Sequence, residues 1–450
     1  MGVKNKIDTL KIKTFPHNLI NRMLLIAFSL LLIASLEFIS YLIIPDTKLS
    51  ELELILKVLE KDPVLFWRQR PDLDVLFQGV KVRTGDRDFR GPKFDLKKSG
   101  NTFRIVCLGP SSTFGWGIEN TGTYVYLLGE LIGSAGVSSR KVEVINAGVI
   151  GYSSCQGKLL LKNDILRLDP DIIIVAYLIN DIDKHRFYRS NGKADNELGE
   201  ENKILVWVEN VLERSNLCRL LKRILLSGKG KSLGYGGGGE GNYFENRRVS
   251  RDDYAANLNQ IINMAEARGI KVVFINTPIG ISYSARKYVD KEGEGRADKC
   301  IDLALTYGSL KGYDPTIKEL RKALEYNPYS ARAFYYLGVY HFKKNDADSA
   351  KIYFQKAKEM ELLECVRLTR VYNDIMSRVA SERNIPMVDA VSAFDEFTRK
   401  TGLSLFINPP HDFVHPNIEG HRIISQEIYR ALFESNLLPS CRRDILTGGK

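Results

Sequence analysis

The chain has 450 residues, of which 44% are hydrophobic and 26% charged, as in an ordinary globular protein. This length exceeds one average domain, so it predicts two domains or one domain with an insertion. The formal net charge of +11 would permit contact with an acidic surface, but basic and acidic residues are interspersed through most of the chain. No known nucleic-acid-binding module is present, and we expect no nucleic-acid partner.

The amino-terminal region carries the longest apolar run. Residues Met23–Ile44 are apolar except for serines, Tyr41 and Glu37. At about 1.5 Å per residue this run is long enough to cross a hydrocarbon core of roughly 30 Å. The preceding residues 1–22 are mostly basic where charged. We therefore expect a transmembrane helix whose amino terminus is cytoplasmic, with everything after Pro45 outside.

The apolar run is longer than the core of a typical signal peptide. No clear small-x-small cleavage site follows it, so we expect an uncleaved anchor rather than a signal peptide. Glu37 is unfavourable in lipid. It marks either contact with a partner helix or a position near enough to the outer interface to reach water.

Five short apolar runs have the length and β-branched content of buried parallel strands. They are Phe103–Leu108, Val142–Asn146, Ile172–Tyr177, Val272–Asn276 and Pro386–Val388. Helical patterns lie between them, at Tyr124–Ile132, Gln156–Leu166, Tyr254–Arg268 and Val371–Glu382. This alternation predicts an α/β fold with a doubly wound, flavodoxin-like parallel sheet of about five strands.

Three residues that could form part of a functional site follow successive predicted strands. Ser111 follows the first strand, Gly151 the second and Asn180 the third. Reacting groups in doubly wound sheets lie beyond the carboxyl ends of the strands, so these residues are expected to meet at one edge. Taken singly, each has a plain structural explanation, because Ser111 would cap a helix and Asn180 would end a strand.

Two segments lie outside this alternation. Residues Gly228–Asn242 are rich in glycine and lack apolar periodicity, which predicts a loop. The helical pattern before them, Ile204–Leu226, places basic residues among leucines, valines and Trp207. Such a helix either packs on the sheet or lies on an anionic membrane surface, and we favour packing on the sheet.

A helical insertion is expected between the fourth and fifth strands. Leu320–Leu324 is echoed by Phe354–Lys358, and the starts of these motifs lie 34 residues apart, the period of a tetratricopeptide (TPR) repeat. The segment resembles one complete repeat and part of another, and stacked helix pairs of this kind form a groove for a protein partner. A helical lid or spacer is the alternative. Cys300 and Cys365 flank the segment, and a disulfide between them is an alternative to two thiols.

The sequence near the carboxyl terminus supplies the groups that a serine nucleophile needs. A serine hydroxyl is a poor nucleophile at neutral pH, so it requires an imidazole to take its proton and a carboxylate to orient that imidazole. Asp412 and His415 lie close together in a segment rich in proline. With Ser111 they predict a Ser–His–Asp triad.

Four sequence blocks resemble the SGNH (GDSL-type) hydrolase superfamily. They are Gly109–Gly115, Asn146–Ser153, Tyr177–Asp181 and Asp412–Asn417. The resemblance covers residues 100–280 and 365–430. The GxSxG elbow of α/β-hydrolases is absent, because Thr113 stands where its second glycine would be.

This resemblance implies Ser111 as the nucleophile, His415 as general base and later acid, and Asp412 as the group that orients the imidazolium. It places the oxyanion hole at the backbone N–H groups of Ser111 and Gly151 and at the side-chain amide of Asn180. Such donors contribute roughly 3–4 kcal/mol each to stabilising the transition state. The resemblance implies no cofactor and no metal.

Two positions depart from the family pattern. Pro110 replaces the usual aspartate, and Leu178 replaces the usual glycine. Neither change removes a catalytic group, because a proline at 110 leaves the N–H of Ser111 intact. A degenerate, inactive member kept as a binding module is the alternative.

The histidines near the carboxyl terminus suggest a metal site as another alternative. Its candidate ligands are His411, Asp412, His415 and His421. The prolines at 409, 410 and 416 prevent the helical i, i+4 arrangement of ligands, so we expect no metal.

The sequence therefore predicts a cytoplasmic tail (1–22), a transmembrane helix (23–44), a hydrolase domain in two parts (46–299 and 365–450) and a TPR-like insertion (300–364). The expected function is a membrane-anchored, extracytoplasmic serine esterase. Its expected substrates are O-acyl esters, such as O-acetyl groups on a cell-envelope or exported glycan. The alternatives are an O-acetyltransferase that uses the same acyl-enzyme, and an inactive anchored scaffold that binds a protein partner through its helical repeats.

Overall fold

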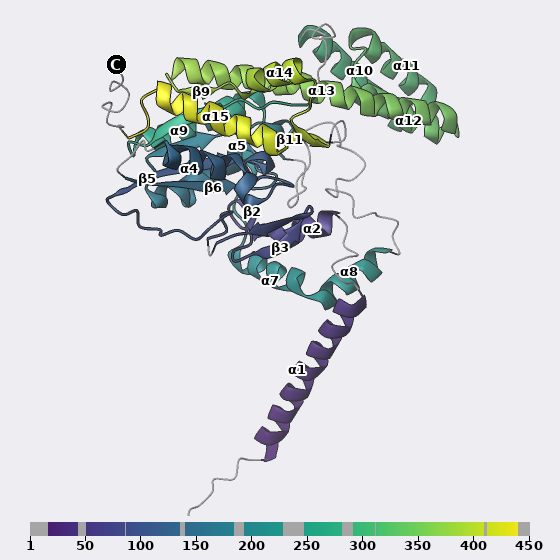
Figure 1. The fold of residues 1–450 in the computed structure, drawn as a ribbon. Helices are drawn as coiled ribbons and strands as arrows, with labels where there is room; N and C mark the ends of the chain where they lie inside the picture. The colour runs from purple at the N-terminus through teal and green to yellow at the C-terminus, as the bar shows by residue number, and fades with distance from the viewer. Residues whose placement is uncertain are drawn as a thin grey trace, which may run out of the picture. The chain divides into compact units, whose positions relative to one another are not determined.

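Figure 1 shows the fold of the chain in a computed structural model. The structure describes residues 17–43, 51–85, 87–135, 140–183, 193–227, 247–280, 291–310, 312–408 and 412–439. The predicted loop Gly228–Asn242, His411 and most of the basic tail lie outside the described residues. Contacts within the chain define two compact units, residues 1–56 with 202–234 and residues 57–201 with 235–450.

The larger unit is built on a five-stranded sheet in which all strands run parallel. In spatial order the strands are β6 (Lys141–Gly148), β5 (Thr102–Gly109), β7 (Ile172–Val175), β8 (Lys271–Ile275) and β9 (Met387–Val388). All five predicted strands are present, and the α/β class is confirmed. Every residue of β5 and β7 is buried, which explains their continuous apolar runs.

Helices cover both faces of this sheet (Figure 1). One face packs against α4 (Tyr124–Ser134), α14 (Ala390–Thr401) and α15 (Ile418–Glu434), whose apolar residues join those of the strands in one core. On the opposite face α9 (Arg251–Glu266) packs against β8, and α5 (Ser154–Asn163) and α13 (Ala347–Glu382) pack against α9. The sheet is therefore doubly wound, as predicted.

The register of β5 brings the ends of three strands to one edge. Gly109 of β5 pairs with Gly148 of β6, and Leu108 pairs with Val175 of β7. Because these strands are parallel, the segments that follow them all leave from the same edge of the sheet. Those segments carry the three residues that were expected to converge.

Two antiparallel hairpins that the sequence patterns do not predict precede the sheet. β1 (Leu59–Asp62) pairs with β2 (Phe66–Gln69), and β3 (Asp74–Phe77) pairs with β4 (Val80–Arg83). Strands of four residues are too short to show a clear alternation of apolar and polar side chains, so periodicity misses them. Among the described residues, the short helices are α3 (Ser111–Phe114), α6 (Ile179–Ile182), η2 (Asn120–Gly122), η3 (Ile165–Leu168) and η4 (Asp195–Glu197).

The segment between β8 and β9 is helical, as expected for the insertion. It contains α10 (Lys291–Leu310), α11 (Tyr313–Tyr326), α12 (Ala331–Lys343) and α13. Apolar residues of α10, α11 and α12 form a core of their own, separate from that of the sheet. The likeness to TPR repeats and the binding of a protein partner stay predictions.

The insertion is continuous with the hydrolase-like part of the chain. Helix α13 runs without a break from 347 to 382, through the predicted boundary at 364/365. Cys300 is a buried thiol that forms no disulfide. The alternative of a disulfide between Cys300 and Cys365 is therefore wrong.

The smaller unit contains α1 (His17–Ile43), the first part of α2 (Glu51–Val58), α7 (Lys203–Arg214) and α8 (Asn216–Ser227). The segment Asn21–Ile43 of α1 is long and apolar enough to cross a membrane. This length and composition agree with the predicted span, whereas the direction of crossing stays a prediction.

The single helix predicted over Ile204–Leu226 is in fact two helices. Ser215 is extended, with φ −75° and ψ 125°, and it separates α7 from α8. Its hydroxyl accepts the N–H of Cys218 at 3.0 Å and so helps to start α8. The expectation that this helix buries its apolar face is wrong, because Ile204 and Trp207 are exposed.

Candidate active site

Ser111 lies at a sharp turn between β5 and α3. Pro110 before it is extended, and its carbonyl accepts the N–H groups of Thr113 and Phe114 at 3.1 and 2.9 Å. The turn presents the Ser111 hydroxyl to His415, whose Nε2 lies 2.8 Å from Oγ. The alternative that Ser111 merely caps a helix is wrong, since the cap position belongs to Pro110.

Glycines let α3 lie directly against the ends of two strands. A Cβ on Gly109 would lie 1.9 Å from Oγ1 of Thr113, and one on Gly148 would lie 2.3 Å from the backbone N of Phe114. Side-chain carbons do not approach other atoms so closely, so these positions require glycine. Asn146 adds a direct link, because its Nδ2 donates to the carbonyl of Thr113 at 2.9 Å.

The other two members of the predicted triad lie on β11 (Asp412–Pro416), which pairs with β10 (Phe406–Asn408). Nδ1 of His415 lies 2.8 Å from Oδ2 of Asp412. The second carboxylate oxygen accepts the N–H groups of Val414 and His415 at 3.2 and 3.0 Å. The ring of Trp116 stacks on the imidazole, with centroids 5.0 Å apart and planes 11° from parallel. The imidazole is therefore held on one side by Asp412 and on its face by Trp116.

The charge state of Asp412 suits this arrangement. Burial alone would raise the pKa of its carboxyl group, but the hydrogen bonds from His415 and Val414 outweigh burial and lower the pKa below its usual value. The group is thus a carboxylate at neutral pH. A carboxylate there can hold Nδ1 protonated and leave Nε2 free to accept a proton from Ser111.

The predicted oxyanion donors lie on the segments after β6 and β7. Gly151 has φ +78°, a left-handed conformation that favours glycine. Within the part of the chain that the structure describes, the N–H groups of Gly151 and Ser111 have no acceptor. Asn180, on α6, donates one amide hydrogen to the carbonyl of Tyr152 at 3.0 Å, and its second N–H remains available. Their role as oxyanion donors stays a proposal.

The two departures from the family pattern are accommodated locally. Leu178 has φ −173°, which lies outside the left-handed region that favours glycine, and its side chain is fully buried. Its carbonyl accepts the N–H of Asp181 at 2.8 Å, which begins the turn that carries Asn180. Pro110 forms the turn described above. Neither residue disturbs a hydrogen bond of the site.

Arg90 holds the far end of α3, and no sequence pattern pointed to it. Its buried guanidinium donates to the carbonyls of Phe114 and Gly115, both at 2.6 Å, and to that of Ile118. Burial lowers the pKa of Arg90 to about 10, so the group stays charged at neutral pH. Arg90 thereby fixes the backbone that follows Ser111.

The first hairpin braces the segment that carries Gly151, residues 148–153, here called the Gly151 loop. Gln69 donates to the carbonyl of Gly148 at 2.7 Å, and the indole N–H of Trp67 donates to that of Ile150 at 2.9 Å. The hydroxyl of Tyr152 donates back to the carbonyl of Trp67 at 2.5 Å. An amino-terminal segment with no motif of its own therefore shapes this loop.

A buried ion pair also supports the Gly151 loop. The guanidinium of Arg248 lies 3.0 Å from the carboxylate of Asp195, and both side chains are almost fully buried. Arg248 also donates to the carbonyl of Gly151 at 2.6 Å and to Oε1 of Gln156 at 2.5 Å. The hydroxyl of Ser153 donates to Asp195 at 2.7 Å. A buried charge is costly unless it is paired and hydrogen-bonded, so these contacts strongly favour one conformation of the loop.

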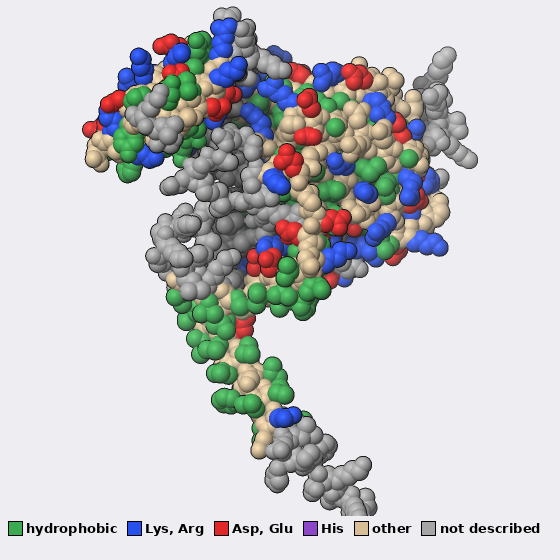
Figure 2. All heavy atoms as spheres, turned by 180° about the vertical axis from the view of Figure 1, so that it is seen from behind, with side chains coloured by type: hydrophobic (Ala, Val, Ile, Leu, Met, Phe, Trp, Pro, Cys, Tyr) green, Lys and Arg blue, Asp and Glu red, His purple; other side chains and the backbone are tan. Residues whose placement is uncertain are grey.

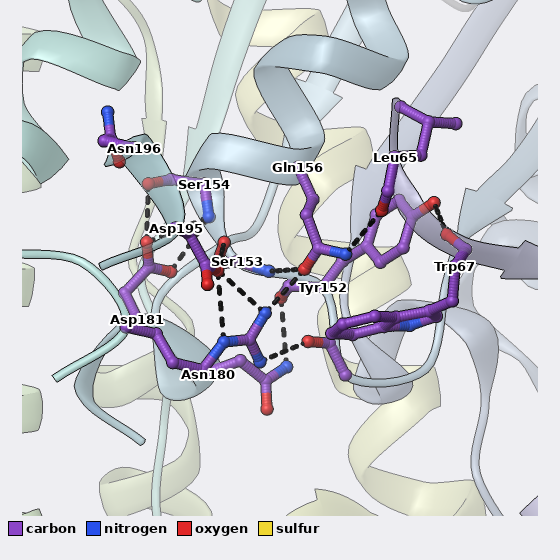
Figure 3. A network of polar contacts seen from close by, with 12 residues as sticks. Leu65, Trp67, Tyr152, Ser153, Ser154, Gln156, Asn180, Asp181, Asp195 and Asn196 are labelled. Atoms are coloured by element: carbon purple, nitrogen blue, oxygen red, sulfur yellow. Dashed lines mark hydrogen bonds and ion pairs between the residues drawn. The ribbon is translucent and has the colours of Figure 1, made fainter. Parts of the chain in front are cut away.

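Asp181, next to Asn180, joins the third segment to α5 (Figure 3). Its two oxygens accept the backbone N–H of Ser154 at 2.9 and 3.1 Å, and one accepts the Ser154 hydroxyl at 2.5 Å. Burial raises the pKa of Asp181 to about 7. The resemblance to SGNH hydrolases implies no catalytic role for Asp181. Its contacts with Ser154 give it a structural role.

Replacing Arg248 by lysine is expected to lower kcat by roughly 10- to 100-fold while changing KM little. Lysine keeps the charge but cannot donate to Asp195, Gln156 and the Gly151 carbonyl together. A misplaced Gly151 N–H weakens an interaction made mainly in the transition state. Steady-state kinetics on an aryl acetate would measure this. Arg268→Lys, at an exposed site, is the matched control, and an effect confined to KM would contradict the positioning role.

The considered metal site gains no support from His421. Its Nδ1 accepts the N–H of Tyr124 at 3.1 Å, and burial lowers its pKa to about 3, so the ring is neutral. Within the described ranges no group of three or more His, Cys, Asp or Glu residues could hold a metal ion. His411 lies outside those ranges.

Comparisons with known proteins reveal only distant likenesses. No protein-family model and no curated protein matches the chain. Among solved structures, LAE5, an alpha/beta hydrolase enzyme from the metagenome of Lake Arreo, Spain, is 15% identical, with 75% of this chain and 96% of that chain covered and a TM-score of 0.36.

Two further solved structures are similar to this chain at a comparable level of identity. Axe2, an acetylxylan esterase from Geobacillus stearothermophilus, is 14% identical, with 74% of this chain and 94% of that chain covered and a TM-score of 0.35. TesA is 12% identical, with 74% and 99% covered and a TM-score of 0.35. At these values the likeness carries no argument about substrate, so we infer function from the site itself.

Proposed function

We propose that the protein is a serine esterase of the SGNH type. The observation that carries this proposal is the chain of two hydrogen bonds, each 2.8 Å, from Ser111 through His415 to Asp412. A serine, an imidazole and a carboxylate in this order form the arrangement that activates a serine hydroxyl. The N–H groups of Ser111 and Gly151, which have no acceptor among the described residues, support the proposal.

In the proposed reaction, Oγ of Ser111 attacks the ester carbonyl carbon while Nε2 of His415 takes the hydroxyl proton. The carbonyl oxygen becomes an oxyanion, which the N–H groups of Ser111, Gly151 and Asn180 stabilise. The tetrahedral intermediate then collapses, the C–O bond to the alcohol breaks, and His415 returns the proton to the departing alcohol oxygen. The acyl group remains as an ester of Ser111.

Water resolves the acyl-enzyme in a second, equivalent half-reaction. His415 takes a proton from water, the hydroxide attacks the acyl carbon, and Ser111 leaves with the proton. An alcohol in place of water would make the enzyme an O-acyltransferase. We propose that the enzyme hydrolyses esters of small acyl groups and that its substrates are acylated glycans. Helix α1 would anchor the protein in a membrane, with the catalytic site on the outer side.

Labelling with a fluorophosphonate probe tests the proposal. The probe forms a P–O bond to an activated serine and releases fluoride, so folded wild-type protein is expected to be labelled. Ser111→Ala should abolish labelling, whereas Ser112→Ala, which removes the neighbouring hydroxyl, should leave it unchanged. Absence of labelling in folded wild type, or labelling that survives Ser111→Ala, would refute an active Ser111.

Product analysis separates hydrolysis from transfer. An O-acetylated xylooligosaccharide is incubated with the full-length protein, with and without a non-acetylated acceptor sugar. Release of free acetate that the acceptor does not diminish is the result expected for an esterase. Quantitative appearance of acetylated acceptor instead of acetate would assign the protein as a transferase.

A further inference from the structure

Helix α7 exposes a row of apolar side chains that a helix in water would bury. Ile204, Trp207, Val208 and Val211 fall on successive turns of one face. Ile204 and Trp207 are 71% and 65% exposed, which is close to full exposure for such large groups. Of the residues of α7, all of which are described, Val206 alone is buried.

Helix α8 continues this apolar surface. Leu221 and Ile224 are exposed, Ile224 by 59%. The sequence of α8 also contains three basic residues and no acidic one, a composition typical of helices that lie on anionic lipid. Figure 2 shows hydrophobic side chains running along α1 and on over the neighbouring helices α7 and α8.

A carboxylate within the apolar helix α1 binds the start of α8. Oε1 of Glu37 accepts the N–H of Asn216 at 3.0 Å, and Oε2 accepts the N–H of Leu217 at 2.6 Å. The first N–H groups of a helix have no partner within the helix and carry partial positive charge, so they suit a carboxylate. These contacts satisfy a charge that would otherwise be costly in lipid. Of the two explanations offered for Glu37 from the sequence, contact with a partner helix therefore applies, and the partner is α8 of the same chain.

The position of Glu37 gives the depth at which α8 begins. Glu37 lies six positions before Ile43, the last residue of α1, which is about 9 Å along the helix axis. Helices that lie in a membrane interface insert their apolar face about 5–10 Å into the boundary between headgroups and acyl chains. Helices α7 and α8 run crosswise to α1 at that level, as an interfacial helix would (Figure 1).

We propose that α7 and α8 are interfacial membrane helices that insert their exposed apolar residues into the lipid leaflet from which α1 emerges. The occupant of this surface is the bilayer itself. Trp207 suits the headgroup region, because its indole combines an apolar body with an N–H donor. This inference depends on the proposed membrane anchoring by α1 and is independent of the catalytic proposal.

Quenching of tryptophan fluorescence by brominated lipid tests the inference. The full-length protein is reconstituted in vesicles of phosphatidylcholine and phosphatidylglycerol, with bromine on the acyl carbons nearest the headgroup. Trp207 is one of three tryptophans, and its share of the emission is expected to be lost. Trp207→Phe should abolish the quenching. In the matched control, Trp207→Phe with Glu213→Trp moves the indole to the side of α7 that carries the buried Val206, away from the exposed apolar residues, and it should stay unquenched.

Flotation of the vesicles after an alkaline carbonate wash distinguishes membrane anchoring by α1 from the interfacial role of α7. Protein that floats while Trp207 stays unquenched would keep the anchor and overturn the interfacial role of α7. Protein that does not float would overturn the anchor. An indole shielded from aqueous iodide but not quenched by bromolipid would assign the face to a second copy of the chain, which also overturns the inference.

A variant of Glu37 provides an independent readout that does not use Trp207. Glu37→Leu removes the carboxylate that accepts the N–H groups of Asn216 and Leu217, so the start of α8 loses both of these hydrogen bonds. Hydrogen–deuterium exchange at the start of α8 is therefore expected to accelerate by about tenfold or more in the reconstituted protein. Ser29→Ala, elsewhere on α1, is the control. Unchanged exchange in Glu37→Leu would contradict the role given to Glu37.

Discussion

Replacing Ser111 by alanine, His415 by alanine, or both together is expected to lower kcat by about the same factor, roughly 10⁵- to 10⁶-fold. The 2.8 Å contact between Oγ and Nε2 is the physical reason. Without the imidazole the hydroxyl keeps its proton, and without the hydroxyl the imidazole has no proton to take. Each single change therefore removes the whole nucleophile, and the second change removes nothing more.

Steady-state hydrolysis of an aryl acetate by the two single variants and the double variant would measure this non-additivity. The matched controls are Ser112→Ala beside the nucleophile and His341→Ala in the helical insertion, which should retain wild-type rates. Effects of the two single changes that multiply in the double variant would show that Ser111 and His415 act separately. Circular dichroism would establish that each variant is folded.

The second large effect is expected for Asp412→Asn, which should lower kcat by roughly 10⁴-fold. The carboxylate accepts a hydrogen from Nδ1 of His415 at 2.8 Å, so the free lone pair of the ring lies on Nε2. An asparagine amide can instead donate to Nδ1, which favours the tautomer with hydrogen on Nε2. That tautomer cannot take the proton of Ser111.

The same substitution also removes the charge that would stabilise an imidazolium, so a loss in kcat rather than in KM is expected. Asp395→Asn changes an exposed carboxylate on α14 and serves as the matched control. Fluorophosphonate labelling of Asp412→Asn should be slowed to a similar degree, because it requires the same activated hydroxyl. Labelling at the wild-type rate would show that Asp412 does not orient His415.

The sheet and the triad geometry illustrate what local pattern can predict. Continuous Val and Ile runs indicate strands buried on both faces, and β5 and β7 have that burial. Parallel strands send their carboxyl ends to one edge, so the order of the motifs along the chain was enough to expect Ser111 and Asn180 near each other. The pairing of Asp412 with His415 could be predicted from their spacing of three residues alone.

The supports of the site could not be predicted in this way. Arg90, Trp67 and Arg248 act by donating to backbone carbonyls on distant segments, and such contacts leave no spacing or periodicity in the sequence. The two amino-terminal hairpins were missed because strands of four residues show no clear period. Helix α7 was misjudged for a different reason: amphipathicity indicates that a face is covered, but not what covers it.

The sequence alone determined the parallel sheet, the chemical groups of the candidate site and the apolar amino-terminal helix, because each depends on residues close together in the chain or on strand order. Tertiary structure decided how those groups are held. Three contacts join segments far apart in sequence: the hydrogen bond between Ser111 and His415, which are 304 positions apart, the bracing of the Gly151 loop by β2, and the bonds from Glu37 to α8. Such contacts arise only when the whole chain packs, since their energies depend on distance and burial rather than on local pattern.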